Sequence, residues 1–368
     1  MKTDHLMKTL AEARPPQLDP LGTPPCPVPL HEAITPARRA RRFRATALIP
    51  AGALAAAAVA AVVVVSLDAP ATTPGTTTEA APPLTASQLL LTAAEHTGAD
   101  SPAAGRYLVT RVEDASVLTV GADDATYEMM VRSSAETWLS RSGREANRVI
   151  SRPLGLTPLT PADVAAWQAA GSPRTVQVRK PLPDGKLGPG SPAKITAGAR
   201  QSSGWDGAAY AIGDTDVSVR DLEKLPSTPT ALRTELLSYF QGGGGDLPTD
   251  RQQWLLTVGT SLITDLPVSG PVRAAAFRMI ADLPGVRSLG TVADRKGRPG
   301  QGFAFTSTSP VTGGIEHRFV IDPSTGRALG QESRVATPGG TTATRDVGSL
   351  LGYTVVLDRR TTDQTPPR

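Results

Sequence analysis

The stretch 315–321, IEHRFVI, has apolar residues at most odd positions and polar residues at most even positions, with His317 and Val320 as the exceptions. A period of two is typical of a β-strand whose sheet has one packed face and one face in water. This stretch therefore predicts an antiparallel sheet near the C-terminus of the chain.

The neighbouring segments extend this sheet into a meander. Asp294-Arg-Lys-Gly297 and the segment 322–327, DPSTGR, have turn composition, because Asp accepts hydrogen bonds from its own backbone and Gly supplies positive φ. Further strands are predicted on either side of these turns, over 286–292, 301–308, 328–335 and 350–357.

The middle of the chain is predicted to be helical. Three segments have apolar residues at helical spacing, and each begins with a capping residue or a proline: 228–240, 250–266 and 271–283. In the second segment, Trp254, Val258, Leu262 and Leu266 follow one another at four-residue steps. We expect a core where these helices meet the C-terminal sheet, formed by Trp254, Leu262, Leu266, Phe277 and Ile280.

The N-terminal part of the folded region also mixes helices and strands. Thr85 and Gln88 have capping-box spacing at the start of a helix that ends at Gly98, and Thr160-Pro161 starts a second helix that ends at Gly171. Strands are predicted over 107–112, 127–131, 136–140 and 144–150, with a hairpin turn at 142–143. The segment 172–204, rich in Pro, Gly and basic residues, is interpreted as a long loop or lid. The fold class is therefore α+β.

Residues 47–67, ALIPAGALAAAAVAAVVVVSL, are uncharged and follow five arginines between Arg38 and Arg44. About 20 such residues span a bilayer as a helix, and flanking arginines stay in the cytoplasm. The segment predicts one transmembrane helix with the N-terminus inside. Two alternatives remain: a buried Ala/Val helix, and a secretory signal cleaved near Ala69-Pro70-Ala71.

The span divides the chain into five parts. We expect a mostly disordered Pro/Arg-rich tail at 1–46, the span at 47–67, a Thr/Pro/Ala stalk at 68–83, an extracytoplasmic domain at 84–358 and a disordered C-terminus at 359–368. The tail has eight Lys and Arg against four Asp and Glu, whereas the remainder has 30 of each. The net charge of +4 therefore reflects topology and does not indicate a nucleic-acid partner.

No catalytic, cofactor-binding or metal-binding residues are predicted. Cys26 and His31, with a distant His5, are too few to form a zinc site, and His96 and His317 are isolated. Carboxylate pairs at 123–124 and at Asp221 and Glu223 have no partner groups in the sequence and are interpreted as solvated. Phosphate-binding and hydrolase motifs are also absent, so we expect no enzyme.

Several motifs resemble an actinobacterial family of single-pass membrane-anchored proteins of unknown function, often encoded beside extracytoplasmic-function sigma factors. The motifs are spread over most of the chain: RRARRFR at 38–44, RYLVTR at 106–111, ETW at 136–138, LPSTPTALR at 225–233, LPGV at 283–286 and FVIDPSTGRAL at 319–329. The resemblance implies a sigma-factor system as a partner inside the cell, and it implies no activity.

At the level of fold, the exterior domain resembles lipoprotein-carrier proteins and related envelope sensors, which have a curved antiparallel sheet with covering helices. The leading hypothesis is a single-pass protein of the cell membrane whose exterior domain binds a hydrophobic ligand or an envelope protein and regulates envelope signalling. The rivals are a structural or interaction module of the envelope that passes no signal inward, and a hydrolase with an unrecognised site.

Overall fold

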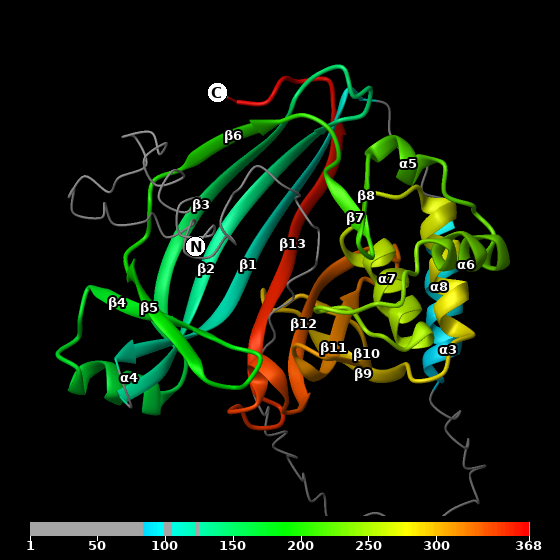
Figure 1. The fold of residues 1–368 in the computed structure, drawn as a ribbon. Helices are drawn as coiled ribbons and strands as arrows, with labels where there is room; N and C mark the ends of the chain where they lie inside the picture. The colour runs from blue at the N-terminus through cyan, green and yellow to red at the C-terminus, as the bar shows by residue number, and fades with distance from the viewer. Residues whose placement is uncertain (1–83, 99–104, 123–124, 368) are drawn as a thin grey trace, which may run out of the picture.

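The computed structural model describes residues 84–98, 105–122 and 125–367. Within them, the fold is α+β and is dominated by one antiparallel sheet of eleven strands, as the fold class predicted. The main path of the sheet has the order β6-β3-β2-β1-β13-β12-β11-β10-β9. Figure 1 shows that this sheet curves strongly from β6 to β9.

Pairing between the first and last strands of the sheet joins its two halves. β1 (Tyr107–Ala122) lies antiparallel to β13 (Leu350–Thr362), so that Asp114 faces Thr354. The other strands of the main path are β2 (Ala125–Ser140), β3 (Asn147–Pro158), β6 (Gln201–Trp205), β9 (Arg287–Ala293), β10 (Pro299–Ser309), β11 (Gly313–Ile321) and β12 (Ala328–Thr337).

The C-terminal meander is confirmed, and the N-terminal strands are longer than predicted. The two strands expected at 127–131 and 136–140 form one continuous strand, β2, which pairs along its length with β1 and β3. Polar residues at 132–134 interrupt the apolar pattern there, but the ladder hydrogen bonds on both sides hold the backbone extended. The turn at 142–143 is confirmed, with Gly143 at φ 66°.

The expectation of a loop or lid at 172–204 is wrong. This segment forms the hairpin β4 (Thr175–Pro181) and β5 (Leu187–Lys194), followed by β6. Val176, Val178 and Ala193 are buried with residues of β1 and β2. The prolines of β5 concealed the strand, yet they are tolerated because β5 pairs with β4 alone and is therefore an edge strand.

The helices begin where their capping residues predicted. In α3 (Ala86–Gly98), Thr85 N donates to Gln88 Oε1 at 2.8 Å, and Thr160 and Asp163 form the capping box of α4 (Pro161–Ala169). The remaining helices are α5 (Val219–Glu223), α6 (Pro229–Ser238), α7 (Arg251–Thr264) and α8 (Gly270–Ala281). A small hairpin, β7 (Tyr210–Ile212) and β8 (Thr215–Val217), and a short 3-10 helix, η2 (Gly340–Thr342), complete the described elements.

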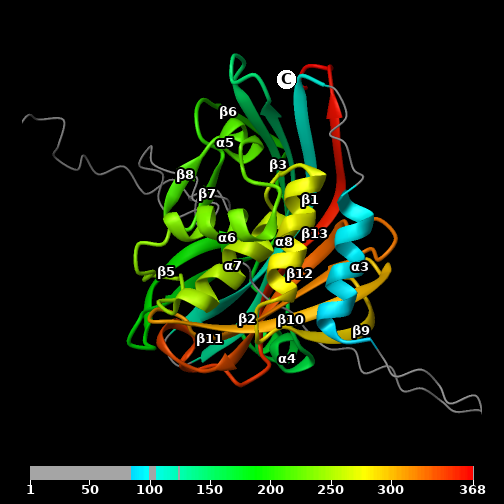
Figure 2. The ribbon, with the colours of Figure 1, turned by 90° about the vertical axis from the view of Figure 1, so that its right-hand side faces the viewer.

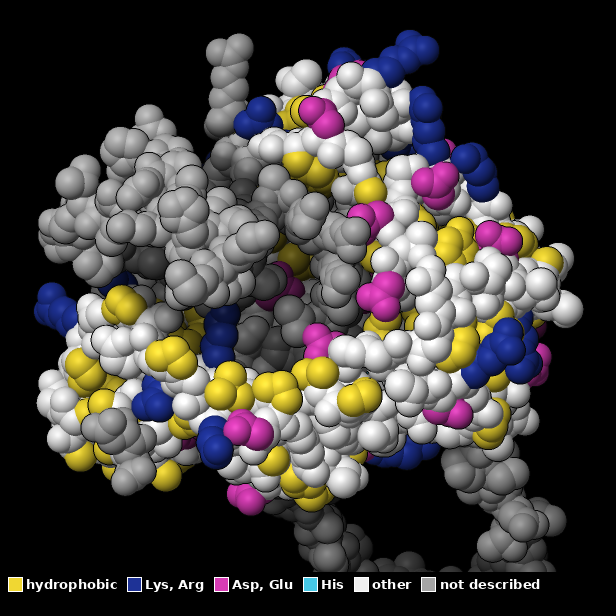
Figure 3. Space-filling model, in the orientation of Figure 1, with side chains coloured by type: hydrophobic (Ala, Val, Ile, Leu, Met, Phe, Trp, Pro, Cys, Tyr) yellow, Lys and Arg dark blue, Asp and Glu magenta, His cyan; other side chains and the backbone are white. Residues whose placement is uncertain are grey.

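The helix layer covers one half of the sheet. Figure 2 shows α3, α6, α7 and α8 in front of the strands, and these helices share one apolar core with β10 and β11. The core includes all five residues predicted from the helical pattern, Trp254, Leu262, Leu266, Phe277 and Ile280, each at most 1 % exposed. Figure 3, in the orientation of Figure 1, shows charged and hydrophobic side chains intermixed on the visible surface of the helix side of the molecule.

The predicted tail, span and stalk lie outside the described residues. Among the residues that the structure describes, no helix is long and apolar enough to cross a membrane. The expected limit of the domain at 358 requires correction, because β13 continues to Thr362 and the structure describes the chain to residue 367.

Candidate functional site

A pocket of about 450 Å³ lies where the helix layer meets β13. Its walls come from segments that are far apart in the sequence: β1, α5, the start of α8, the turn after β11, the start of β12 and the end of β13. Its ionisable lining residues are six arginines and three carboxylates, namely Arg141, Arg273, Arg298, Arg327, Arg359, Arg360, Glu223, Asp322 and Asp358. The lining therefore has a formal surplus of three positive charges.

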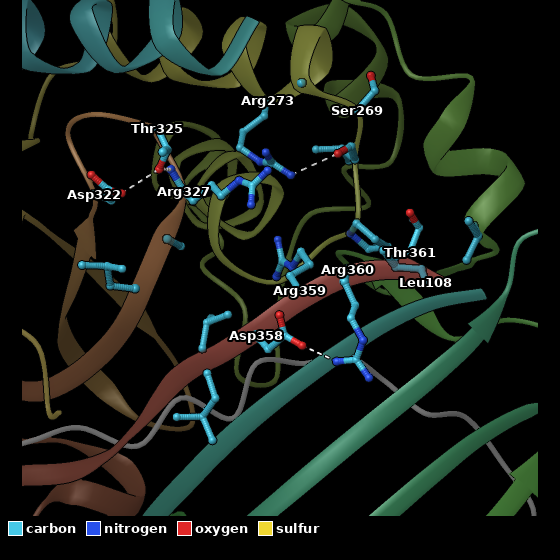
Figure 4. Close-up of a pocket in the computed structure, with 18 of the residues that line it drawn as sticks. Leu108, Ser269, Arg273, Asp322, Thr325, Arg327, Asp358, Arg359, Arg360 and Thr361 are labelled. Carbon is cyan, nitrogen blue, oxygen red and sulfur yellow. Dashed lines mark hydrogen bonds and ion pairs between the residues drawn. The ribbon is translucent and has the colours of Figure 1, made fainter. Parts of the chain in front are cut away.

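The start of α8 forms one wall. Ser269 is the N-cap residue and its side chain accepts a hydrogen bond from Val272 N at 3.4 Å, while Pro271 occupies the first turn, where its missing N–H is not needed. Arg273, one turn into the helix, donates from Nη2 to the carbonyl oxygen of Val268 at 3.1 Å. The preceding loop is thereby tied to the helix, and Arg273 is held at the pocket (Figure 4).

The turn 322–327 forms a second wall. Asp322 accepts hydrogen bonds from Ser324 N at 2.9 Å and from Thr325 Oγ1 at 2.9 Å. Partial burial acts to raise the pKa of Asp322, but these hydrogen bonds outweigh it and lower the pKa overall. The turn chemistry inferred from the sequence is therefore present, and it places Arg327 on the pocket wall.

The second predicted turn, Asp294-Arg-Lys-Gly297, holds Arg298, which lines the pocket. Asp294 accepts from Lys296 N at 2.8 Å, and its other carboxylate oxygen accepts from Arg298 Nε at 2.7 Å. Arg298 also donates to the carbonyl oxygens of Leu329 and Val356, at 2.9 and 2.8 Å. This arginine therefore joins β12 to β13 at the pocket.

A row of polar side chains crosses the covered face of the sheet beside the pocket. Thr354 Oγ1 donates to Asp114 Oδ1 at 2.7 Å, and Gln331 Nε2 donates to Asp265 Oδ1 at 2.7 Å. Burial raises the pKa of Asp265, against the hydrogen bonds from Gln331 and Thr264 and the charge of Arg359. Burial also raises the pKa of Asp114 to about 6, against the hydrogen bond from Thr354 and with further increases from the Asp265 and Glu113 charges.

The two described histidines contact other groups. His317 lies on the covered face of β11, with its Nε2 2.8 Å from Ser307 Oγ and its ring stacked on Phe305 at 4.8 Å. Burial lowers its pKa to about 4, so the imidazole is neutral at pH 7. His96 Nδ1 lies 2.6 Å from the carbonyl oxygen of Pro323. Neither histidine is among the pocket-lining residues.

The carboxylate pair at Asp221 and Glu223 has structural partners. Asp221 accepts from Ser218 in the capping box of α5, and Glu223 pairs with Arg141 at 3.2 Å. The pair at 123–124, and also Cys26, His31 and His5, lie outside the described residues. Within the described part of the chain, no three His, Cys, Asp or Glu side chains form a group that could hold a metal ion.

The sequence did not indicate the arginine-lined pocket. Its residues extend from Leu108 to Thr361, and each arginine is unremarkable in its own segment. The one local signal was the DPSTGR turn, which was interpreted as turn chemistry alone. The pocket becomes visible only through the pairing of β1 with β13 and the packing of α8 over them.

No family model, curated protein or solved structure matches this chain.

Proposed function

We propose that this chain is a single-pass membrane protein whose exterior domain binds a ligand in the pocket beside β13 and serves a regulatory role in envelope signalling. The observation that carries the proposal is the pocket itself, since about 450 Å³ is a typical size for a small-molecule site. Apolar side chains such as Leu108 and Val356 share its lining with the charged groups. Such a mixture of apolar wall and convergent polar groups is typical of binding sites.

The lining favours binding over catalysis. It contains neither histidine nor cysteine, and its carboxylates have partners: Glu223 pairs with Arg141, Asp358 with Arg360, and Asp322 is bonded within its own turn. A general base must reach the proton that it removes, and these carboxylates are already engaged. An open pocket also favours ligand binding over a purely structural role, which remains the alternative function.

Filling the pocket tests this function. Leu357 lines the pocket and is 38 % exposed, so Leu357→Trp adds volume there without overpacking the core. Val347→Trp is the matched control, because Val347 is 69 % exposed and lies outside the pocket. The full-length proteins would be extracted from membranes in mild detergent, and bound small molecules identified by native mass spectrometry. We expect a bound ligand in the wild type and in Val347→Trp, and its loss in Leu357→Trp. Equal ligand in all three proteins, or none in any, would contradict the proposal.

A further inference from the structure

We infer that the pocket holds its ligand by an oxyanion, a carboxylate or phosphate group, bound by Arg359 together with Arg327 and Arg273. This inference rests on the proposed function and names the chemical class of the ligand. Its first basis is charge: six arginines and three carboxylates line the pocket, and the arginines remain in excess after Asp294, which pairs with Arg298, is counted. A surplus of positive charge in a partly desolvated site is unfavourable unless an anion offsets it.

Arg359 provides the second basis. Its Nη2 donates to the carbonyl oxygens of Thr264 and Asp265, at 2.9 and 3.4 Å, at the C-terminal end of α7. Its Nε is buried and has no hydrogen-bond partner. A buried N–H group without an acceptor is destabilising, and a shift of the Arg359 side chain toward an anion in the pocket would supply the acceptor.

Asp265 places a carboxylate near Arg359, whereas Arg327 adds a second positive charge. Burial lowers the pKa of Arg359, and although Tyr210 and Asp265 act to raise it, the charge of Arg327 lowers it further. The neighbouring Asp265 directs its carboxylate to Gln331 and Thr264, and burial raises its own pKa. The site therefore keeps two cations close together.

The geometry of the three arginines suits an oxyanion. Arg273 comes from α8, Arg327 from the turn before β12 and Arg359 from β13, and Figure 4 shows the three side chains directed toward a shared space. The planar guanidinium group presents paired N–H donors that match a carboxylate or a phosphate. The N-terminal end of α8 at Gly270 also borders the pocket, and its helix dipole favours negative charge.

Two sources of such an oxyanion differ in the rest of the ligand. A free phosphate or small carboxylate would use the arginines alone, whereas the head group of an amphiphile would also place apolar carbon against the lining. Leu108, Val356 and Leu357 provide an apolar wall in the same pocket. The experiment therefore uses one probe for each source.

Isothermal titration of the full-length protein in a neutral detergent would use inorganic phosphate and hexyl phosphate as probes. We expect Arg359→Gln and Arg327→Gln each to weaken binding of both probes by about tenfold or more, as loss of a charge-assisted hydrogen bond predicts. The matched control is Arg278→Gln, on α8 and outside the pocket, which should bind as the wild type does. Circular dichroism would verify the fold, and if one variant unfolds the other provides the test.

The two probes separate the sources. If hexyl phosphate binds more tightly than phosphate and Leu357→Asn removes the difference, the oxyanion is a head group; equal affinities identify a free anion. The inference is overturned if neither probe binds, or if both bind equally to the wild type and to the two pocket variants. If a ligand co-purifies and is lost in Leu357→Trp while the arginine variants retain it, the proposed function stands and the oxyanion assignment fails. If no ligand co-purifies and no probe binds, both fail.

Discussion

Ionisation of the buried Asp114 carboxyl group should lower the free energy of unfolding as the pH rises from about 4 to neutral. This carboxyl group lies on the covered face of the sheet, where β1 pairs with β13 and Thr354 donates to it at 2.7 Å. Burial raises its pKa from 3.8 to about 6, against that hydrogen bond and with smaller increases from the charges of Asp265 and Glu113. The group therefore ionises in the unfolded chain at a lower pH than in the folded protein.

The sign and magnitude follow from proton linkage. Between pH 3.8 and about 6, the folded state binds more protons than the unfolded state, so the free energy of unfolding decreases as the pH rises. At about 1.36 kcal/mol for each pKa unit, the full effect is about 3 kcal/mol. Asp114→Asn keeps an acceptor for Thr354 and cannot ionise. The variant should therefore resemble the wild type near pH 4 and exceed its stability by about 2–3 kcal/mol at pH 7.5.

Urea unfolding of both proteins at several pH values between 4 and 7.5 measures this difference. Subtracting the two free energies removes the contribution of every other titrating group. Asp184→Asn, in the exposed turn of the β4–β5 hairpin, is the matched control. If the difference between the wild type and Asp114→Asn is the same at all pH values, Asp114 is not desolvated in the way described.

His317→Gln should show the opposite pH dependence: burial lowers the pKa of His317 to about 4, so the contribution of this residue to the free energy of unfolding decreases by about 3 kcal/mol as the pH falls from 6.5 to 4, and urea unfolding of the variant should lack that decrease. Trp254→Ala should lower the free energy of unfolding by about 3–5 kcal/mol, because Trp254 is 1 % exposed in the helix-layer core; an unchanged melting temperature would refute that packing. Gly213→Ala should be more destabilising than Gly207→Ala by about 1–3 kcal/mol in thermal melts, since both glycines have positive φ but only at Gly213 would a Cβ lie 2.7 Å from the Trp254 ring. A periplasmic-type reporter fused after Arg368 should be active only outside the cytoplasm, and a mature protein beginning near Ala71 would refute the uncleaved anchor.

Local sequence patterns predicted the elements that bury one continuous face. In α7, the four-residue steps from Trp254 to Leu266 predicted both the helix and its buried side. In β11, the alternation placed Phe319 and Ile321 on the covered face. His317 shares that face and interrupts the apolar pattern, because Ser307 and Phe305 provide a hydrogen bond and a stacked ring for a neutral imidazole.

Long-range pairing was not predictable in the same way. The pattern of β1 indicates a strand but does not specify β13 as its neighbour, and that register places Asp114 opposite Thr354 and Leu108 opposite Thr361. The hairpin at 175–194 was missed because its two buried valines lie among prolines, glycines and basic residues that usually indicate a loop. The pocket depends on two features that no single segment encodes. These are the order of the strands and the packing of the helices on the sheet.

The turn 322–327 contacts helix α3 on one side and lines the pocket on the other. On one side, His96 and Thr97 of α3 contact the carbonyl oxygens of Pro323 and Thr325, and a side chain at Gly326 would collide with Thr97. On the other side, the same turn supplies Arg327 to the pocket. The turn therefore joins α3 to the pocket wall, so that any change in its position at the pocket would also change its contacts with His96 and Thr97.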